Sequence, residues 1–256
     1  MKSNPWYSDT FDEEYLRLYR HARPPERIRR DVENVLRLLR LPRGRHILDL
    51  CCGHGSHSIE LAKHEYKVKG FDQSDYMLGQ AKLDAERAEV EVGWIRGDMR
   101  DLPFEREFDA VINMFNSFGF LETEKEDQRV LNLVSKALRP NGLFLQELPN
   151  LEAFARTFQP TTVTRLADET FVIDEREFDM VDSQLHLRHI CLYPNGERTS
   201  LDFHQRLYPP PKMLNMLQVA GFEIEEIFGE LDGRSLTLDS NQLVILSRKR
   251  PEVVVE

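Results

Sequence analysis

Residues 47–55 read ILDLCCGHG, an apolar run followed by two closely spaced glycines. The run at 46–50 predicts a buried strand, and Gly53 and Gly55 follow it in a loop. Glycine permits a tight turn and lets the backbone approach a ligand closely. A helix predicted at 56–63 would point its first amide groups at the same ligand. The stretch therefore predicts a ligand-binding loop at the carboxyl end of a strand.

The alternation of strand and helix continues along most of the chain. Helices are predicted at 74–88, 122–138 and 211–220, and six further strands at 66–72, 92–96, 108–114, 143–148, 222–228 and 243–247. Strands that alternate with helices form a parallel sheet with both faces covered. We therefore predict an α/β fold, with a Rossmann-like, mostly parallel seven-stranded sheet and helices on both faces.

A different pattern follows residue 150. Alternating apolar and polar residues in 161–208, with an Asn195-Gly196 turn, predict a small antiparallel β insert. An earlier apolar pattern over 5–20 predicts helical structure. The chain is thus expected to divide into a helical lid (1–44), a cofactor-binding core (45–150), a substrate-covering insert (151–210) and a C-terminal helix with the last two core strands (211–250). The tail from Pro251 is expected to be loose.

Composition and charge limit the classes of partner. Asp and Glu outnumber Lys and Arg by 44 to 34, for a formal net charge of −10, which argues against a nucleic-acid partner. No apolar run is long enough to span a membrane, and residues 1–10 lack the pattern of a secretory signal. Three cysteines, two of them adjacent, form neither a disulfide framework nor zinc spacing. We predict a cytoplasmic protein without a metal or a membrane partner.

Two carboxylates follow later strands at the same edge of the expected sheet. Asp72 ends the second strand, where a carboxylate accepts hydrogen bonds from ribose hydroxyls in dinucleotide-type sites. Asp98 follows the third strand in the sequence Gly97-Asp98-Met99. Each carboxylate also has a simpler explanation, as a helix cap or a turn residue. Their common position at the carboxyl edge favours a binding role.

Together these motifs resemble the class I S-adenosylmethionine-dependent methyltransferase family, over roughly 28–150 and 211–248. The resemblance implies methyl transfer (EC 2.1.1.-), with S-adenosylmethionine as cofactor and S-adenosylhomocysteine as product. It places the glycine loop and Asp49 at the methionine part, Asp72 on the ribose, and Asp98 with Met99 at the adenine. Cys51 stands where the family commonly has glycine. The implied cofactor-binding residues are Asp49, Cys51, Gly53, Gly55, Asp72, Gln73, Asp98, Met99, Met114 and Tyr7.

The methyl acceptor has no motif of its own. Polar residues after the fourth and fifth strands and on the insert are candidates because they would face the same edge. His204 is a candidate base and Arg206 a candidate ligand for a carboxylate or phosphate. Helix caps, a satisfied strand end and an outward polar face are the simpler explanations. The candidates for catalysis are Asn116, Glu147 and His204, and those for substrate binding are Asn116, Ser117, Arg206 and Tyr208.

Aromatic residues near the N-terminus are candidates for a lid over the cofactor. Their rings would attract the sulfonium charge through a cation–π contact, although an amphipathic helix that only packs explains them too. The residues are Trp6, Tyr7, Phe11 and Tyr15.

Three other functions stay open at this point. A nicotinamide oxidoreductase would favour glycine where Ser58 stands, and would need a catalytic Tyr/Lys or Cys/His set. A catalytically silent cofactor-binding protein would act in regulation or interaction. An RNA or protein methyltransferase would share the same core. The acidic charge and the insert favour a small-molecule acceptor, with N- or O-methylation.

Overall fold

The computed structural model describes residues 6–8, 10–20 and 24–251. Its larger sheet has seven strands in the order β10-β11-β5-β4-β1-β2-β3. Their bounds are β1 His46–Leu50, β2 Lys67–Asp72, β3 Gly93–Arg96, β4 Phe108–Asn113, β5 Leu138–Pro149, β10 Phe222–Phe228 and β11 Gln242–Lys249. The predicted Rossmann-like α/β fold is confirmed.

The strand order reverses beside β1, at the centre of this sheet. β1 pairs in parallel with β2 on one side and with β4 on the other. Loops that leave β1 and β4 therefore diverge, and open α/β sheets bind their ligands in the crevice formed there. β11 runs antiparallel to both β5 and β10, so the last strand is reversed as expected.

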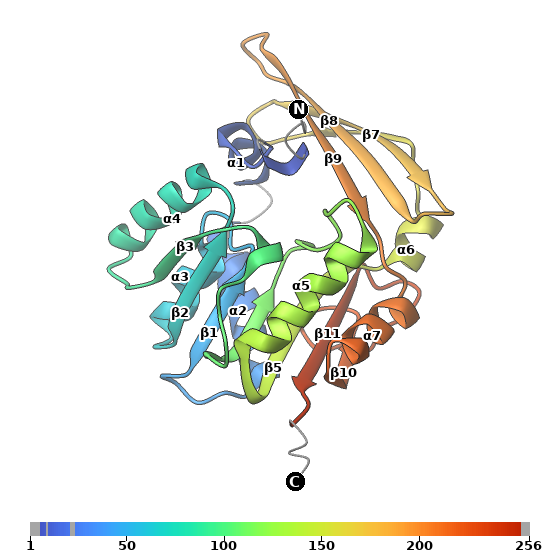
Figure 1. Ribbon diagram of the computed structural model, residues 1–256. Helices are drawn as coiled ribbons and strands as arrows, with labels where there is room; N and C mark the ends of the chain where they lie inside the picture. The colour runs from blue at the N-terminus through green and yellow to red at the C-terminus, as the bar shows by residue number, and fades with distance from the viewer. Residues whose placement is uncertain (1–5, 9, 21–23, 252–256) are drawn as a thin grey trace, which may run out of the picture.

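Helices cover both faces of the larger sheet (Figure 1). α5 (Glu124–Ala137) and α7 (Pro210–Val219) pack on one face, while α2 (Pro25–Leu39) and α3 (Ser56–Lys63) pack on the other. α4 (Asp75–Arg87) lies against β2 and β3. β4 is buried at every residue, as a parallel strand between two helical layers should be.

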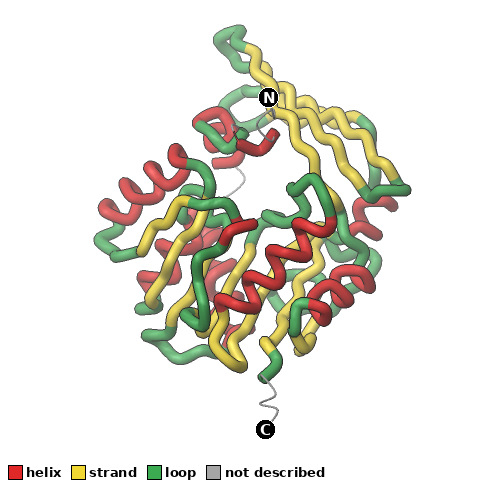
Figure 2. The backbone as a smooth tube through the Cα atoms, viewed as in Figure 1, coloured by secondary structure: helices red, strands yellow, loops and turns green. Residues whose placement is uncertain are grey.

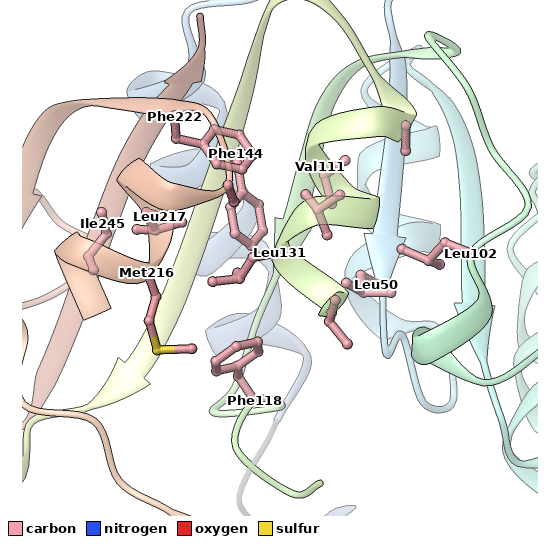
Figure 3. Close-up of a cluster of buried hydrophobic side chains, with 14 of the residues drawn as sticks. Leu50, Leu102, Val111, Phe118, Leu131, Phe144, Met216, Leu217, Phe222 and Ile245 are labelled. Atoms are coloured by element: carbon pink, nitrogen blue, oxygen red, sulfur yellow. The ribbon is translucent and has the colours of Figure 1, made fainter. Parts of the chain in front are cut away.

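The core on the α5 and α7 side is packed with aromatic and aliphatic side chains. Leu131 of α5 and Leu217 of α7 lie against Phe144 and Phe222 of the sheet, and Phe118 extends this cluster toward the carboxyl edge (Figure 3). Large buried apolar side chains of this kind contribute about 1.5–3 kcal/mol each to folding. This packing fixes the strand ends on which the candidate site is built.

The insert forms a separate four-stranded antiparallel sheet in the order β6-β7-β8-β9, as expected. Its strands are β6 Thr161–Arg165, β7 Phe171–Asp179, β8 Gln184–Leu192 and β9 Arg198–Arg206, and α6 (Leu151–Arg156) connects them to β5. The sheet stands beyond the carboxyl edge of the larger sheet, beside α1 (Figure 1, Figure 2). Its buried face packs against Leu18 of α1 through Val172, Cys191, Leu201 and Phe203.

The range 5–20, for which the sequence predicted helical structure, contains two separate helical segments. A short 3-10 helix, η1 (Trp6–Ser8), precedes α1 (Glu13–Arg20). Asp12 explains the break, because its carboxylate accepts the backbone N–H groups of Glu14 and Tyr15 and so starts a new helix. Parts of the predicted lid (1–5, 9 and 21–23) and most of the tail (252–256) lie outside the described residues. The four-part division of the chain stays a prediction.

In the described ranges, no helix combines the length and hydropathy needed to cross a bilayer.

Candidate cofactor and acceptor site

A pocket lies over the carboxyl ends of the parallel strands, and its empty space amounts to about 840 Å³ when the part open to solvent is included. The loops after β1, β2 and β3 form one wall, and the loop after β4 forms another. Residues of the N-terminal segment complete the lining. The first wall contains Cys51, Gly53, His54, Phe71, Asp72, Gln73, Met77, Gly97, Asp98 and Met99.

The loop after β1 has the conformation that its glycines permit. Gly53 and Gly55 both have positive φ, and a side chain on Gly55 would overlap the ring of Trp94. Cys51 also has a positive φ of 61°, a conformation that glycine adopts more readily than cysteine. The turn exposes Cys51 and Gly53 to the pocket, while Gly55 lies behind them as the residue before α3.

Asp72 joins this loop to the end of β2. Its carboxylate accepts the backbone N–H of Gly53 at 2.8 Å and that of Ser74 at 2.9 Å. Burial raises the pKa of Asp72, although these hydrogen bonds act in the opposite direction. The carboxylate thus lines the pocket in an orientation fixed by two loops, as a ligand for paired hydroxyl groups requires.

Asp98 lines the pocket and also holds an arginine. Both of its oxygens accept hydrogen bonds from the Arg100 guanidinium, and one also accepts the Arg100 backbone N–H. Burial would raise the pKa of Asp98, but these bonds hold it below its usual value. Arg100 also bonds Glu126 at 2.8 Å, so any group bound by Asp98 shares the carboxylate with a fixed cation.

The N-terminal segment is hydrogen-bonded to the cofactor side of the pocket. The Gln73 side chain donates to the carbonyl of Tyr7 at 2.9 Å, and the Ser74 hydroxyl donates to the carbonyl of Phe11 at 2.6 Å. Tyr7, Phe11 and Tyr15 therefore line the pocket. The Tyr7 side chain is only 4% exposed and its hydroxyl has no partner. A buried hydroxyl without a partner fits a pocket whose ligand supplies one.

Several predicted cofactor residues lie behind the pocket. Asp49 is buried and accepts the Ser58 hydroxyl at 2.6 Å, so it supports the start of α3. Met114 is buried, and its carbonyl accepts the Ser117 hydroxyl. With Gly55, these residues are absent from the lining, whereas Tyr7, Cys51, Gly53, Asp72, Gln73, Asp98 and Met99 belong to it.

Of the residues predicted for the acceptor, some line the pocket and others do not. Ser117 lines the pocket, but Asn116 and Glu147 do not. His204 packs instead against Trp6 and His186, with ring centroids 5.6 and 4.3 Å away, and burial lowers its pKa. Sequence reasoning missed Phe120 and Leu121 in the lining. The aromatic residues in the SFGF run at 117–120 were the available signal.

Arg206 and Tyr208 lie away from the pocket because Asp127 holds them. Asp127, fully buried in the first turns of α5, accepts the Tyr208 hydroxyl at 2.6 Å and an Arg206 N–H at 3.3 Å. A buried carboxylate needs such partners, and removing one would be costly. The structure therefore places these two predicted substrate residues in a buried cluster outside the pocket lining.

This cluster predicts a pH effect on stability. Burial raises the pKa of Asp127 to about 6, against the hydrogen bonds from Tyr208 and Arg206. Between about pH 4 and pH 6 the folded protein keeps a proton that the unfolded chain has lost, so stability falls as pH rises. The wild type should lose about 3 kcal/mol of unfolding free energy through this group between pH 4 and pH 7, and Asp127→Asn should not. The difference in unfolding free energy, variant minus wild type, should therefore rise by about 3 kcal/mol over this range.

Urea unfolding followed by circular dichroism at several pH values measures this gain. Asp182→Asn, at an exposed carboxylate in the β7–β8 turn, is the control and should run parallel to wild type. Parallel curves for Asp127→Asn as well would show that Asp127 does not titrate in this range.

The fold and the pocket together define a class of protein. The pocket lies at the strand-order reversal, and its wall combines a glycine loop with carboxylates after β2 and β3. This arrangement characterises Rossmann-like enzymes that bind a nucleoside cofactor.

Comparison with known proteins gives the family. Residues 47–142 match the methyltransferase domain family. A dTDP-3-amino-3,4,6-trideoxy-alpha-D-glucopyranose N,N-dimethyltransferase of Streptomyces venezuelae is 28% identical, over 80% of this chain and 86% of its own length. A protein of Synechocystis sp. (strain ATCC 27184 / PCC 6803 / Kazusa), the uncharacterized methyltransferase sll0829, is 32% identical over 56% of this chain and 71% of its own length. The chain therefore belongs to the class I S-adenosylmethionine-dependent methyltransferases and is a methyltransferase of class EC 2.1.1.-.

Solved structures share the whole fold. The CcbJ methyltransferase from Streptomyces caelestis superposes with a TM-score of 0.84 at 23% identity, over 95% of this chain and 99% of that one. CalS10, an amino pentose methyltransferase from Micromonospora echinaspora solved with S-adenosylmethionine bound, gives a TM-score of 0.69 at 22% identity, over 93% and 97%. The likeness therefore includes the antiparallel sheet as well as the core.

Proposed function

We propose that this methyltransferase transfers the methyl group of S-adenosylmethionine to an amine nitrogen of a small molecule. The observation that carries the proposal is the aromatic lining of the pocket beside the cofactor wall. Phe11 and Tyr15 come from the N-terminal segment, and Phe115 and Phe120 come from the loop after β4. Aromatic faces stabilise cations, and methylation of an amine gives a positively charged nitrogen before the proton leaves.

The cofactor would lie along the wall formed by the loops after β1, β2 and β3. Asp72 would accept the ribose hydroxyls, the backbone at Gly53 would contact the methionine part, and Asp98 with Met99 would contact the adenine. When bound, S-adenosylmethionine supplies a methyl group on a positively charged sulfur. The protein's part is to orient the acceptor in line with that methyl group and to exclude water.

An amine acceptor also agrees with the charges of the lining. The carboxylates of the lining, Asp72 and Asp98, are on the cofactor wall, and the loop after β4 contributes Phe115, Ser117, Phe120 and Leu121. A hydroxyl acceptor would benefit from a general base, whereas a neutral amine needs none. The relative from Streptomyces venezuelae is named as an N,N-dimethyltransferase of an amino sugar nucleotide, which supports the same chemistry.

A small acceptor is favoured over RNA or protein because the N-terminal segment encloses part of the pocket. Tyr7, Phe11 and Tyr15 line it, and the segment that carries them is hydrogen-bonded to the cofactor wall at Gln73 and Ser74. The net charge of −10 also disfavours a polyanionic acceptor. The cytoplasmic location stays a prediction from composition.

A paired acceptor screen tests this proposal. We expect release of S-adenosylhomocysteine with small primary or secondary amines, including amino sugars, and at least about 10-fold lower kcat/KM with the matching hydroxyl compounds, because a hydroxyl loses the cationic stabilisation. Total RNA and a protein mixture serve as comparison acceptors. Equal turnover of an amine and its hydroxyl counterpart, or turnover of RNA or protein alone, would contradict the proposal.

A further inference from the structure

Two consecutive residues of the loop after β4 have left-handed backbone conformations. Phe115 has φ 57° and Asn116 has φ 61°. Asparagine tolerates this region, but for a bulky residue such as phenylalanine it is unusual and costs about 1–2 kcal/mol. Strain of this kind persists only where the surroundings enforce it, and it gathers at functional sites. Here it lies in the pocket wall, since Phe115 and Ser117 are both lining residues.

Glu147 holds this turn from the side of the larger sheet. Its carboxylate accepts the backbone N–H of Phe115 at 2.8 Å. The residue is 5% exposed and lies in β5, where its backbone is paired with Val244 of β11. A carboxylate on a rigid central strand therefore fixes the amide of the strained residue.

Gln205 holds the same turn from the antiparallel sheet. Its side-chain amide donates to the carbonyl of Asn116 at 2.8 Å and to that of Phe118 at 2.9 Å. The next residue of β9, Arg206, donates its backbone N–H to the carbonyl of Gly119 at 2.7 Å. β9 thus holds the loop after β4 through both side-chain and backbone hydrogen bonds.

We infer that Glu147 and Gln205 are positioning residues, which act by holding the Phe115–Asn116 turn so that the Phe115 ring and the Ser117 hydroxyl face the acceptor. Glu147 is then an acceptor for a backbone amide instead of the base considered from sequence. The inference rests on the proposed function only in taking this wall of the pocket as the acceptor side. The strained turn and its hydrogen bonds do not depend on the identity of the acceptor.

Two substitutions of Glu147 separate positioning from base catalysis. In Glu147→Gln the side-chain carbonyl still accepts the Phe115 N–H, but it cannot take a proton. We expect this variant to keep kcat/KM for the acceptor within about threefold, with an unchanged pH profile. Glu147→Ala leaves the amide without its partner and should lower kcat/KM by about 10- to 100-fold. Equal losses in both variants would overturn the inference.

Amide hydrogen exchange tests the same idea without any acceptor. The Phe115 amide should exchange slowly in wild type and in Glu147→Gln, and at least about 10-fold faster in Glu147→Ala. S-adenosylhomocysteine affinity should stay within about threefold of wild type in both variants, since Glu147 is absent from the pocket lining. Unchanged Phe115 exchange in Glu147→Ala would refute the hydrogen bond, whether or not amines prove to be acceptors.

Gln205 supplies a second and independent test. Gln205→Glu keeps the size of the side chain but removes both N–H donors, so it should speed exchange in the 115–119 loop and lower kcat/KM by about 10-fold or more. Glu225→Ala, at a partly exposed carboxylate of β10 paired with Arg248, is the control and should change neither. If Glu147→Ala does not fold, the test is the comparison of Gln205→Glu with Glu147→Gln. Wild-type exchange and kcat/KM in Gln205→Glu would refute the positioning role.

Discussion

Replacing Asp72 with alanine is expected to weaken S-adenosylhomocysteine binding by about 2–3 kcal/mol, or roughly 30- to 150-fold. The proposed ribose contact is lost, and the amides of Gly53 and Ser74 lose their shared acceptor as well. The loop that carries Gly53 would then no longer be fixed to the end of β2. Titration calorimetry with S-adenosylhomocysteine measures the change directly.

Two further variants make this experiment specific. Asp72→Asn keeps one oxygen acceptor and should fall between wild type and alanine. Asp75→Ala removes an exposed carboxylate three residues away, which is paired with Arg96 at 2.5 Å, and should bind with unchanged affinity. Because burial raises the pKa of Asp72, affinity should also fall as the solution is acidified. Wild-type affinity in Asp72→Ala would refute the ribose assignment.

The second large effect is expected from Gly119→Ala, which should destabilise the protein by about 3 kcal/mol or more. Gly119 has φ 87°, and a side chain there would overlap the carbonyl oxygen of Arg206. That oxygen belongs to the backbone of β9, so it cannot move without distorting the antiparallel sheet. The bond from the Arg206 N–H to the Gly119 carbonyl would be lost with it.

Gly196→Ala is a matched control, because it shares the conformation without the crowding. Gly196 has φ 85° in the β8–β9 turn, and a side chain there meets nothing within 4 Å. Its cost should be about 1 kcal/mol, from backbone conformation alone. Denaturant unfolding of both variants separates the cost of the backbone conformation from the cost of the steric overlap. Equal destabilisation would mean that the close approach of Gly119 to the Arg206 carbonyl does not limit the side chain at this position.

The cofactor side of the site was predictable because its signals are local. A glycine turn directly after a strand, and a carboxylate at the end of the next strand, are short sequence patterns with a fixed geometric meaning. Asp72 and Gly53 accordingly line the pocket where the pattern placed them. Asp49 belongs to the same pattern, yet it lies behind the loop, because its carboxylate accepts the Ser58 hydroxyl.

The acceptor side was much less predictable because its contacts join residues far apart in the chain. Arg206 and Tyr208 looked like substrate ligands on a polar strand face, but Asp127, about 80 residues away, is their partner. The role inferred for Glu147 depends on Phe115, which is 32 residues away in the loop after β4. Such pairings follow from strand order and loop path, which no local pattern specifies.

Local patterns in the sequence predicted the class of fold, the succession of core strands and helices along the chain, and the glycine loop that lines the pocket. These depend on hydrophobic periodicity and on glycine, whose effects act over a few residues. Which polar side chains face the pocket, and which hold its loops in place, depends instead on contacts between distant parts of the chain. A buried carboxylate or amide takes the nearest partner that satisfies it, and packing alone brings that partner within reach.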